Sequence, residues 1–200
     1  MKAVLLDVPA DLLERRRKMG IDQWDEMWDG VLHMVPSPIP RHQDVEFRLQ
    51  AWLCTFWVPR SGGRVLQQAN VSLHDAGPEW LQNYRIPDLI LLTPARLGLE
   101  REAYFAGGPD VVVEVRSPGD ETYEKVPFYT AAGVTELWVI DRDTRVPEIH
   151  VLNGDGAGTR VAAAADGWLT STLGIELRAE RDARLAVRLR GDPTTAACVP

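Results

Sequence analysis

The sequence predicts an α/β or α+β fold in which a mixed central β-sheet is flanked by helices, and three observations lead to it. The strongest strand signals are Asp88–Thr93, Val111–Arg116 and Glu136–Asp141, which are rich in β-branched residues and leucine. Apolar residues recur at helical spacing from His42 to Trp57. A second helix is expected over Glu121–Ala132, between two of the strands. Helices that alternate with strands in this way form layers around one sheet.

The remaining elements follow in chain order. A short helix is expected over Pro9–Lys18, with Gly20 as its end. Gln23–Val35 is predicted to form two strands around Asp29-Gly30, a dipeptide favoured in tight hairpins. Pro59 is expected to end the long helix. Further strands are expected at Arg64–Leu73, Val146–Leu152 and Arg184–Arg190.

Length and composition indicate one globular domain. The chain has 200 residues, of which 45% are hydrophobic and 26% charged, as in ordinary globular proteins. We expect a single domain over residues 1–190, followed by a flexible tail at 191–200. No apolar run approaches the roughly 20 residues that span a bilayer, so a membrane partner is not expected. Cys54 and Cys198 have neither a disulfide nor a zinc-site spacing, and cytoplasmic residence is expected.

The charge balance restricts the possible partners. The net charge of −7 argues against a simple nucleic-acid-binding protein, because affinity for nucleic acid comes largely from Lys and Arg. A metal site would itself be acidic, however, and would contribute to that sum. The chief basic cluster, Arg15–Lys18, is expected to be a solvated helix face rather than a DNA-binding patch.

Two acidic residues stand in strands that are otherwise apolar. Asp88 lies in the run Ile86–Leu92, and Glu114 lies in the run Pro109–Arg116. An unpaired ionised carboxylate in such surroundings costs several kcal/mol, so it normally has a cation or several donors as partners. Two such acids, one in each of two strands, suggest one shared cation. A divalent metal ion with oxygen ligands is the simplest candidate.

Other interpretations of the acidic residues remain open. Asp88 follows a proline at the start of its strand, and the alternative is a half-exposed carboxylate paired with Arg85 or Arg116. Asp110 is expected to be a strand-start residue and Asp141 a turn residue.

The residues around the two acids resemble a known family. The superfamily is the PD-(D/E)XK (restriction-endonuclease-like) nucleases, and the branch is the Uma-two-like restriction endonucleases. The resemblance covers roughly residues 20–150. The strings that carry it are Trp28-Asp29-Gly30-Val31-Leu32, Ser37-Pro38 followed by His42, Pro87-Asp88, Glu114-Val115-Arg116-Ser117-Pro118, Lys125-Val126-Pro127-Phe128-Tyr129 and Gly133-Val134-Thr135-Glu136-Leu137-Trp138-Val139-Ile140-Asp141.

The resemblance implies a restriction-endonuclease-like core, here with an N-terminal β-hairpin addition, and metal-dependent hydrolysis of phosphodiester bonds. Asp88 and Glu114 would hold Mg²⁺, with the backbone carbonyl of Val115 as a further ligand and Mn²⁺ as a substitute ion. The superfamily usually has lysine two residues after the acid, where this chain has Arg116. Arginine keeps its proton above pH ~12 and is a poor general base. Members of the branch carry a lysine at Lys125, which implies a migrated catalytic lysine.

Two residues of the long helix are further candidates. His42 and Glu46 are separated by one turn and point to one side. In the superfamily an acid from this helix approaches the metal. The alternative is an exposed helix surface, and both interpretations remain open. Tyr129, near Lys125, is expected to pack in the core.

Two functions of different classes remain possible. The first is a metal-dependent endonuclease that acts on nucleic acid, DNA before RNA, and forms a homodimer by analogy with superfamily enzymes that cut both strands. The alternative is a catalytically weakened nuclease-fold module with a binding or regulatory role. Arg116 and the acidic net charge favour this alternative.

Overall fold

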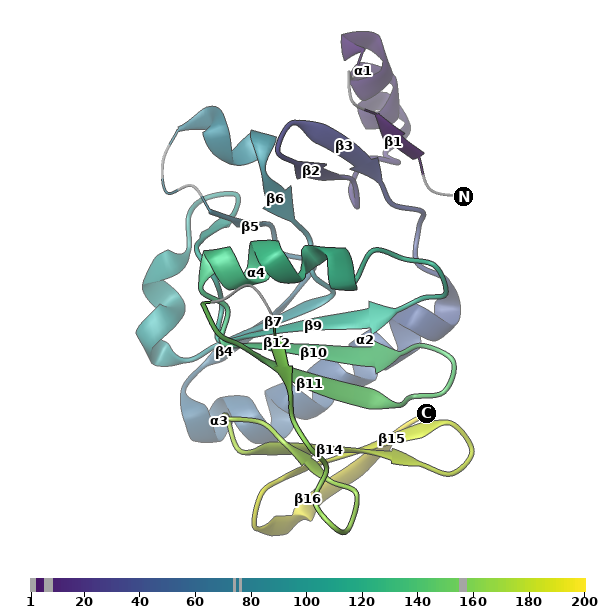
Figure 1. Ribbon diagram of the computed structural model, residues 1–200, viewed down its shortest axis with the longest axis vertical. Coiled ribbons are helices and arrows are strands. Elements are labelled where there is room, and N and C mark those ends of the chain that lie inside the picture. The colour runs from purple at the N-terminus through teal and green to yellow at the C-terminus, as the bar shows by residue number, and fades with distance from the viewer. Residues whose placement is uncertain (1–2, 6–8, 74, 76, 155–157) are drawn as a thin grey trace.

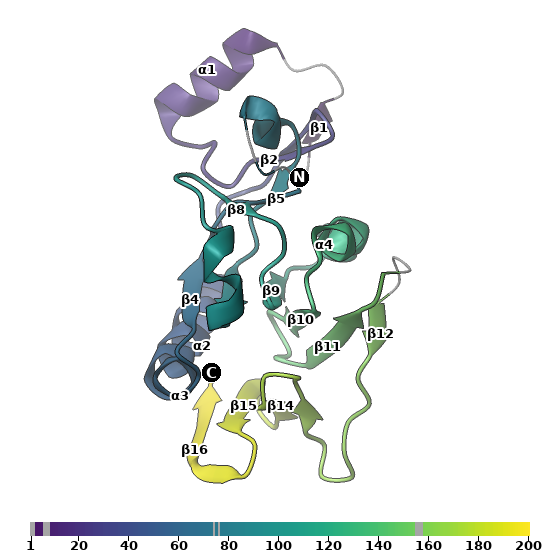
Figure 2. The same ribbon diagram turned by 90° about the vertical axis from the view of Figure 1, so that its left-hand side faces the viewer.

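The strands form three sheets that follow one another along the long axis of the molecule (Figure 1). A computed structural model describes residues 3–5, 9–73, 75, 77–154 and 158–200. Within these ranges, the sheets are an N-terminal one, a central one and a C-terminal one. The central sheet carries a helix on each face (Figure 2).

The central sheet is mixed, as expected. Strands β9 and β10 are parallel, and their neighbours pair antiparallel. The predicted ranges of these two strands are confirmed residue for residue. In sheet order the strands are β12 (Gly158–Arg160), β11 (Pro147–Leu152), β10 (Glu136–Asp141), β9 (Val111–Arg116), β7 (Leu89–Leu92) and β4 (Arg64–Gln67).

The long helix covers one face of the central sheet. Helix α2 (Pro40–Trp52) continues as a π-helical turn, Leu53–Trp57, and then as α3 (Val58–Ser61). The prediction that Pro59 ends the helix is therefore wrong. Pro59 lies in α3, directly after the π-helical turn, and the helix continues past it. The helix ends at Gly62, which has the left-handed conformation typical of helix ends.

Two shorter helices are close to their predicted positions. Helix α4 (Val126–Ala132) covers the opposite face of the central sheet and is preceded by the 3₁₀ turn Tyr123–Lys125. Helix α1 (Ala10–Met19) is followed by Gly20 in the left-handed conformation, as the sequence predicts.

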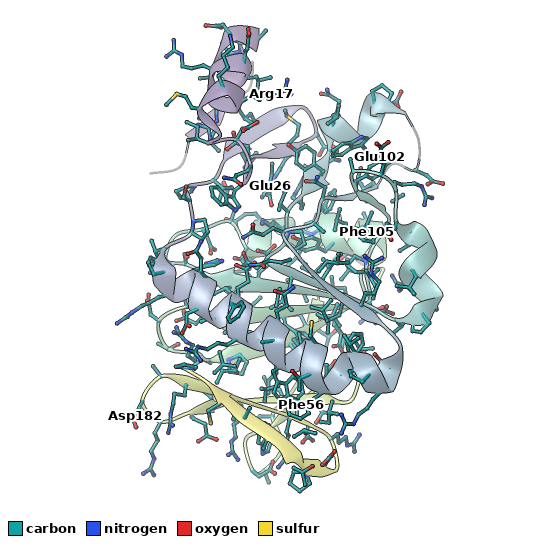
Figure 3. All side chains as sticks on the ribbon, turned by 180° about the vertical axis from the view of Figure 1, so that it is seen from behind. Arg17, Glu26, Phe56, Glu102, Phe105 and Asp182 are labelled. Atoms are coloured by element: carbon teal, nitrogen blue, oxygen red, sulfur yellow. The ribbon has the colours of Figure 1, made fainter. Side chains whose placement is uncertain are left out.

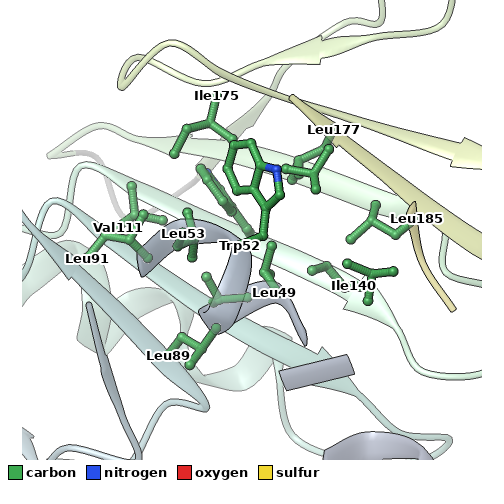
Figure 4. Close-up of a cluster of buried hydrophobic side chains, with 14 of the residues drawn as sticks. Leu49, Trp52, Leu53, Leu89, Leu91, Val111, Ile140, Ile175, Leu177 and Leu185 are labelled. Carbon is green, nitrogen blue, oxygen red and sulfur yellow. The ribbon is translucent and has the colours of Figure 1, made fainter. Parts of the chain in front are cut away.

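Two apolar cores lie on the two faces of the central sheet. The larger core packs α2 and one face of β7, β9 and β10 against the C-terminal sheet (Figure 4). Figure 4 shows Leu49 and Trp52 of α2 inside this cluster. The second core lies beneath α4 and contains Val112, Phe128 and Tyr129. Since side chains alternate along a strand, Glu114 shares the α4 face with Val112.

The predicted hairpin belongs to the N-terminal sheet. Asp29 and Gly30 both have positive φ (50° and 83°), which gives the tight turn that the sequence predicts. The predicted strand Arg64–Leu73 is divided between two sheets, with Gln68 at a φ of 51° where they separate. In sheet order the N-terminal strands are β1 (Ala3–Leu5), β3 (Val31–Met34), β2 (Glu26–Trp28), β6 (Tyr84–Arg85), β5 (Val71–Ser72) and β8 (Phe105–Ala106).

The C-terminal sheet corrects one expectation. Residues 192–199 form a strand, not the predicted flexible tail at 191–200. The strand is held because Thr195 and Val199 are buried and the Trp52 indole donates a 2.7 Å hydrogen bond to the Thr195 carbonyl. The order of strands is β13 (Leu169–Thr170), β14 (Ile175–Glu180), β15 (Arg184–Leu189) and β16 (Asp192–Val199).

Candidate active site

A cavity of about 430 Å³ lies where the N-terminal sheet meets the central sheet. Its polar wall contains an acid from the hairpin, a histidine from α2, and the acids and lysine of the central layer. Its other wall is largely apolar. The polar lining includes Glu26, His42, Asp88, Glu114 and Lys125 as well as Asp120, Glu121 and Arg142, and the apolar lining includes Trp24, Ile39, Ile86 and Pro118.

Asp88 precedes β7 and is held by two donors. One carboxylate oxygen lies 2.8 Å from Nε2 of His42, and the other accepts a 2.6 Å hydrogen bond from the Val115 backbone N–H. Asp88 pairs with neither Arg85 nor Arg116 among the described contacts, so that alternative is wrong. Burial lowers the pKa of His42, but the hydrogen bond and charge of Asp88 outweigh it and leave that pKa raised.

Glu46 is a buried acid with an unusual environment. Its exposure is 0%, and neither carboxylate oxygen has a hydrogen-bond partner of ordinary geometry among the described residues. Burial raises the pKa of Glu46 to about 7, and the charge of Asp88 adds to the rise, whereas Gln67 and His42 oppose it. The interpretation of Glu46 and His42 as exposed helix surface is wrong, because both are shielded from solvent.

One donor atom from each of His42, Glu46 and Asp88 lies within 4.8 Å of the others. An imidazole and two carboxylates suit a divalent cation such as Mn²⁺, and an unpartnered buried carboxylate is a physical reason for one to bind. These residues therefore fit a metal ion.

Glu114 projects from β9 toward α4 and is also buried. One of its oxygens, Oε1, accepts a 2.5 Å hydrogen bond from the Tyr129 hydroxyl and lies 3.1 Å from Nζ of Lys125. Burial raises the pKa of Glu114, Lys125 opposes the rise, and the charge of Asp88 adds to it. Tyr129 is buried in the core, as expected, and it also holds this carboxylate.

Lys125 lies in the 3₁₀ turn before α4 and is paired with two carboxylates. Its Nζ is 2.8 Å from Glu26 and 3.1 Å from Glu114. Burial lowers the pKa of Lys125, but the charges of Glu114 and Glu26 outweigh burial, and the net pKa is raised. The ammonium group therefore remains charged.

Glu26 of β2 is a site residue that the sequence analysis missed. Figure 3 labels it on the hairpin, at the side that faces the central sheet. It is buried and contacts Lys125, although 99 residues separate the two in the chain. The only local signal is an acid within an otherwise apolar hairpin strand, and nothing in the sequence indicates the distant lysine.

Arg116 does not contact Glu114 among the described interactions. Its guanidinium group donates a 2.8 Å hydrogen bond to Asp141, and its side chain is 40% exposed. Asp141 also accepts hydrogen bonds from the backbone N–H groups of Asp143 and Thr144, as a turn residue does. At the position where the superfamily has its usual lysine, this chain thus has an arginine directed to a surface turn.

The structure brings most of the predicted site residues together at one cavity: His42, Asp88, Glu114, Val115 and Lys125 line it. Glu46 lies beside it, within reach of His42 and Asp88. Arg116 is not among the described lining residues. Their roles in catalysis remain predictions.

The chain has a mixed α+β fold with an acidic cavity, and comparisons with known proteins identify its family. The model of the Uma2 family, described as "Putative restriction endonuclease", matches residues 20–186. The chain therefore belongs to the Uma2 family, and the family-level function is that of a nuclease. A comparison with curated proteins returned no match.

A solved structure supports the fold. A "putative nuclease belonging to DUF820" from Anabaena variabilis ATCC 29413 is similar, with a TM-score of 0.56 and 16% sequence identity. The match covers 74% of this chain and 80% of that chain. The predicted fold class is confirmed. In the described part of the chain, no helix has both the length and the apolar character needed to cross a membrane.

Proposed function

We propose that this protein is a metal-dependent endonuclease that hydrolyses phosphodiester bonds of nucleic acid, with DNA as the first candidate substrate. One observation carries the proposal: a buried carboxylate–lysine pair, Glu114 and Lys125, opens onto the same cavity as Asp88 and His42. Family membership supports the same reaction class.

Asp88, Glu114 and the Val115 carbonyl would hold Mg²⁺, or Mn²⁺ in its place. His42 and Glu46 are candidate additional ligands, because they lie beside Asp88. A bound divalent ion supplies charge neutralisation at the phosphate and lowers the pKa of a bound water. The protein contributes a low-polarity cavity in which such electrostatic effects are strong.

Lys125 would act as a fixed cation. Because the two acids beside it raise its pKa, it keeps its proton and does not serve as a general base. A held ammonium group stabilises negative charge that develops on a phosphate oxygen and orients an attacking water through its N–H donors. Burial raises the pKa of Tyr129, so its hydroxyl keeps its proton and holds Glu114 in place.

A second candidate function is a nuclease-fold module with weakened catalysis and a binding role. Arg116 at the usual lysine position favours it, and so does the net charge of −7. Binding of a divalent ion distinguishes the two, because the metal site of such a module is weakened.

The decisive experiment is calorimetric titration of Mn²⁺ into the native protein and the Glu114→Ala and Asp88→Asn variants. Asp110→Asn is the matched control, because Asp110 adjoins the other end of β9 and binds the Thr93 N–H and Arg96. We expect saturable binding to the native protein and the control, and loss of binding in the two site variants. Native protein that binds no Mn²⁺, alone or with a DNA oligonucleotide, would favour the binding module.

We further propose a homodimer and action in the cytoplasm. The dimer rests on analogy with enzymes that cut both strands of DNA. The compartment is supported by Cys54 and Cys198, both free thiols. Sedimentation equilibrium of the native protein tests the dimer.

A further inference from the structure

We propose that Glu26, on the N-terminal hairpin, is a positioning residue that holds Lys125 for the reaction. The proposal rests on the proposed nuclease function and assigns to the hairpin a part in it. Oε1 of Glu26 lies 2.8 Å from Nζ of Lys125, closer than the 3.1 Å contact between Lys125 and Glu114. Glu26 is thus the nearer of the two anions that hold the lysine.

The Glu26 carboxylate is itself fixed by two donors. Its Oε1 accepts a 2.8 Å hydrogen bond from the Ile86 backbone N–H, and its Oε2 accepts one of 2.8 Å from the indole of Trp28. A buried carboxylate with its acceptor positions filled has little freedom to rotate. The ammonium group of Lys125, which is bonded to this carboxylate, is therefore held in place as well.

The hairpin is anchored against helix α4, which begins directly after Lys125. The Arg85 guanidinium group lies between two rings, 4.1 Å from the Trp28 centroid and 4.2 Å from the Phe128 centroid. The same guanidinium donates a 3.0 Å hydrogen bond to the Met27 carbonyl. Because Trp28 is in β2 and Phe128 is in α4, this stack joins the strand that carries Glu26 to the helix that begins directly after Lys125.

A second anion on Lys125 has a chemical consequence for Glu114. If Glu114 were the only partner of the lysine, one carboxylate would have to satisfy a full buried ammonium charge and also bind a metal ion. Glu26 shares that charge. In this arrangement Lys125 and Tyr129 both bind Oε1 of Glu114, and Oε2 is in none of the described hydrogen bonds.

The chain contains a matched control for this residue. Glu26-Met27-Trp28 and Glu136-Leu137-Trp138 share one arrangement, in which a buried strand glutamate accepts a hydrogen bond from the indole two residues later. Glu136 also accepts hydrogen bonds from Ser171 and from the backbone of Thr172, and a lysine is not among its described partners. Glu136→Gln therefore reproduces the structural cost of Glu26→Gln without touching Lys125.

The test combines two measurements on the full chain. The sequence has three lysines, Lys2, Lys18 and Lys125, so nitrogen-15 labelling of lysine gives few ammonium signals. A buried ammonium group with two fixed acceptors exchanges slowly with water and gives a visible signal. The second measurement is cleavage of plasmid DNA with Mn²⁺, with kcat and KM determined separately, at a temperature where all variants are folded.

We expect Glu26→Gln to broaden or shift the Lys125 ammonium signal and to lower kcat by about tenfold or more, with KM and calorimetric Mn²⁺ affinity within about twofold of the native values. Glu136→Gln is expected to leave the signal and kcat unchanged, even where it lowers the melting temperature. A Glu26→Gln variant with native kcat, or with a kcat that falls only as far as that of Glu136→Gln, overturns the proposal. If the native protein cleaves no DNA, the nuclease proposal fails separately. The ammonium signal then decides alone: no change in Glu26→Gln overturns the positioning role, and loss of the signal supports it.

Discussion

At the scale of single residues, the site has more buried acids than cations. Glu26 and Glu114 share Lys125, whereas Asp88 depends on His42 and a backbone N–H. The carboxylate of Glu46 has no hydrogen-bond partner of ordinary geometry among the described residues. Burial raises the pKa values of Glu46 and Glu114, and the negative charge of Asp88 raises both further. A divalent cation would relieve this repulsion, which is a physical reason for one to bind here.

The Glu46 carboxyl predicts how stability depends on pH. Its pKa rises from 4.5 to about 7 in the folded protein, because burial favours the neutral form. The stability that this gives is fully present below the unfolded pKa and is lost as the pH rises through about 7. Glu46→Gln, which is always neutral, is therefore expected to stabilise the metal-free protein by about 2–3 kcal/mol near pH 8 and hardly at all near pH 4.

Urea unfolding in the presence of a chelator measures this effect at the two pH values. Asp44→Asn on the same helix is the control, because Asp44 is exposed and paired with Arg48. If Glu46→Gln and the native protein show the same pH dependence, Glu46 is ionised in the folded state and the prediction is wrong.

Removal of the two candidate catalytic cations, Lys125 and Arg116, is expected to have very different effects on DNA cleavage. Lys125→Met removes the ammonium group beside Glu114 and is expected to lower DNA cleavage by about a hundredfold or more. Arg116→Met removes a group that pairs with Asp141 at the surface, and we expect less than about a threefold change. Circular dichroism of both variants verifies folding, because Lys125→Met leaves two buried acids without their cation. If Arg116→Met loses more cleavage activity than Lys125→Met, the arginine and not the lysine is the catalytic cation.

At the scale of elements, the segment before β9 packs closely against the C-terminal end of α4. Gly108, before β9, donates a 2.6 Å hydrogen bond to the carbonyl of Ala132 at the end of α4. A Cβ atom at Gly108 would lie 2.3 Å from the backbone nitrogen of Val134 and 2.7 Å from the carbonyl carbon of Gly133. Since backbone atoms cannot rotate away as a side chain does, the strand and the helix end would have to separate.

Gly108→Ala is therefore expected to lower the free energy of unfolding by about 2–4 kcal/mol. Gly98→Ala is the matched control, because a Cβ atom there meets nothing within 4 Å. Thermal and urea unfolding of both variants measure the difference. Equal stability of the two would show that β9 and α4 can move apart without cost.

The elements differ in how far the sequence alone predicts them. Strands β9 and β10 are predicted to the residue, because their apolar runs are bounded by Pro109 and Gly133. The passage of the long helix through Pro59 is not predicted, because a π-helical turn leaves no mark in hydrophobic periodicity. Strand β16 is missed for a related reason: its inward positions include Thr195, whose polar side chain hides the alternation of buried residues.

At the scale of the whole molecule, the C-terminal sheet covers the core behind α2. The indole of Trp52 donates to the Thr195 carbonyl, and Val199 is 2% exposed. Deletion of residues 192–200 is expected to lower the free energy of unfolding by about 3 kcal/mol or more, since it exposes this core and leaves the indole without its acceptor. Denaturant unfolding measures the loss, with Cys198→Ser as the control because Cys198 is exposed on the same strand. A truncated chain of native stability would restore the view of this segment as a tail.

The sequence predicts only part of the candidate site, because some of its contacts form only when two sheets pack together. Asp88 and Glu114 are visible in the sequence because each interrupts an apolar run, and Lys125 follows from family resemblance. The contact between Glu26 and Lys125 is not visible, since it arises only when the N-terminal sheet docks on the central one. The local sequence pattern predicts the strands and the acidic residues within them. The packing of one sheet on another determines which of these residues come into contact.

The separation of Glu26 from Lys125 along the chain has a consequence for synthesis on the ribosome. The hairpin leaves the ribosome first, and its carboxylate then has no ammonium partner until 99 further residues have been added. Under the proposed function, a chain that ends before Lys125 carries acids of the site without their cation and is expected to be inactive toward nucleic acid. Hydrolytic capacity thus emerges only when translation has passed α4 and the central sheet has closed.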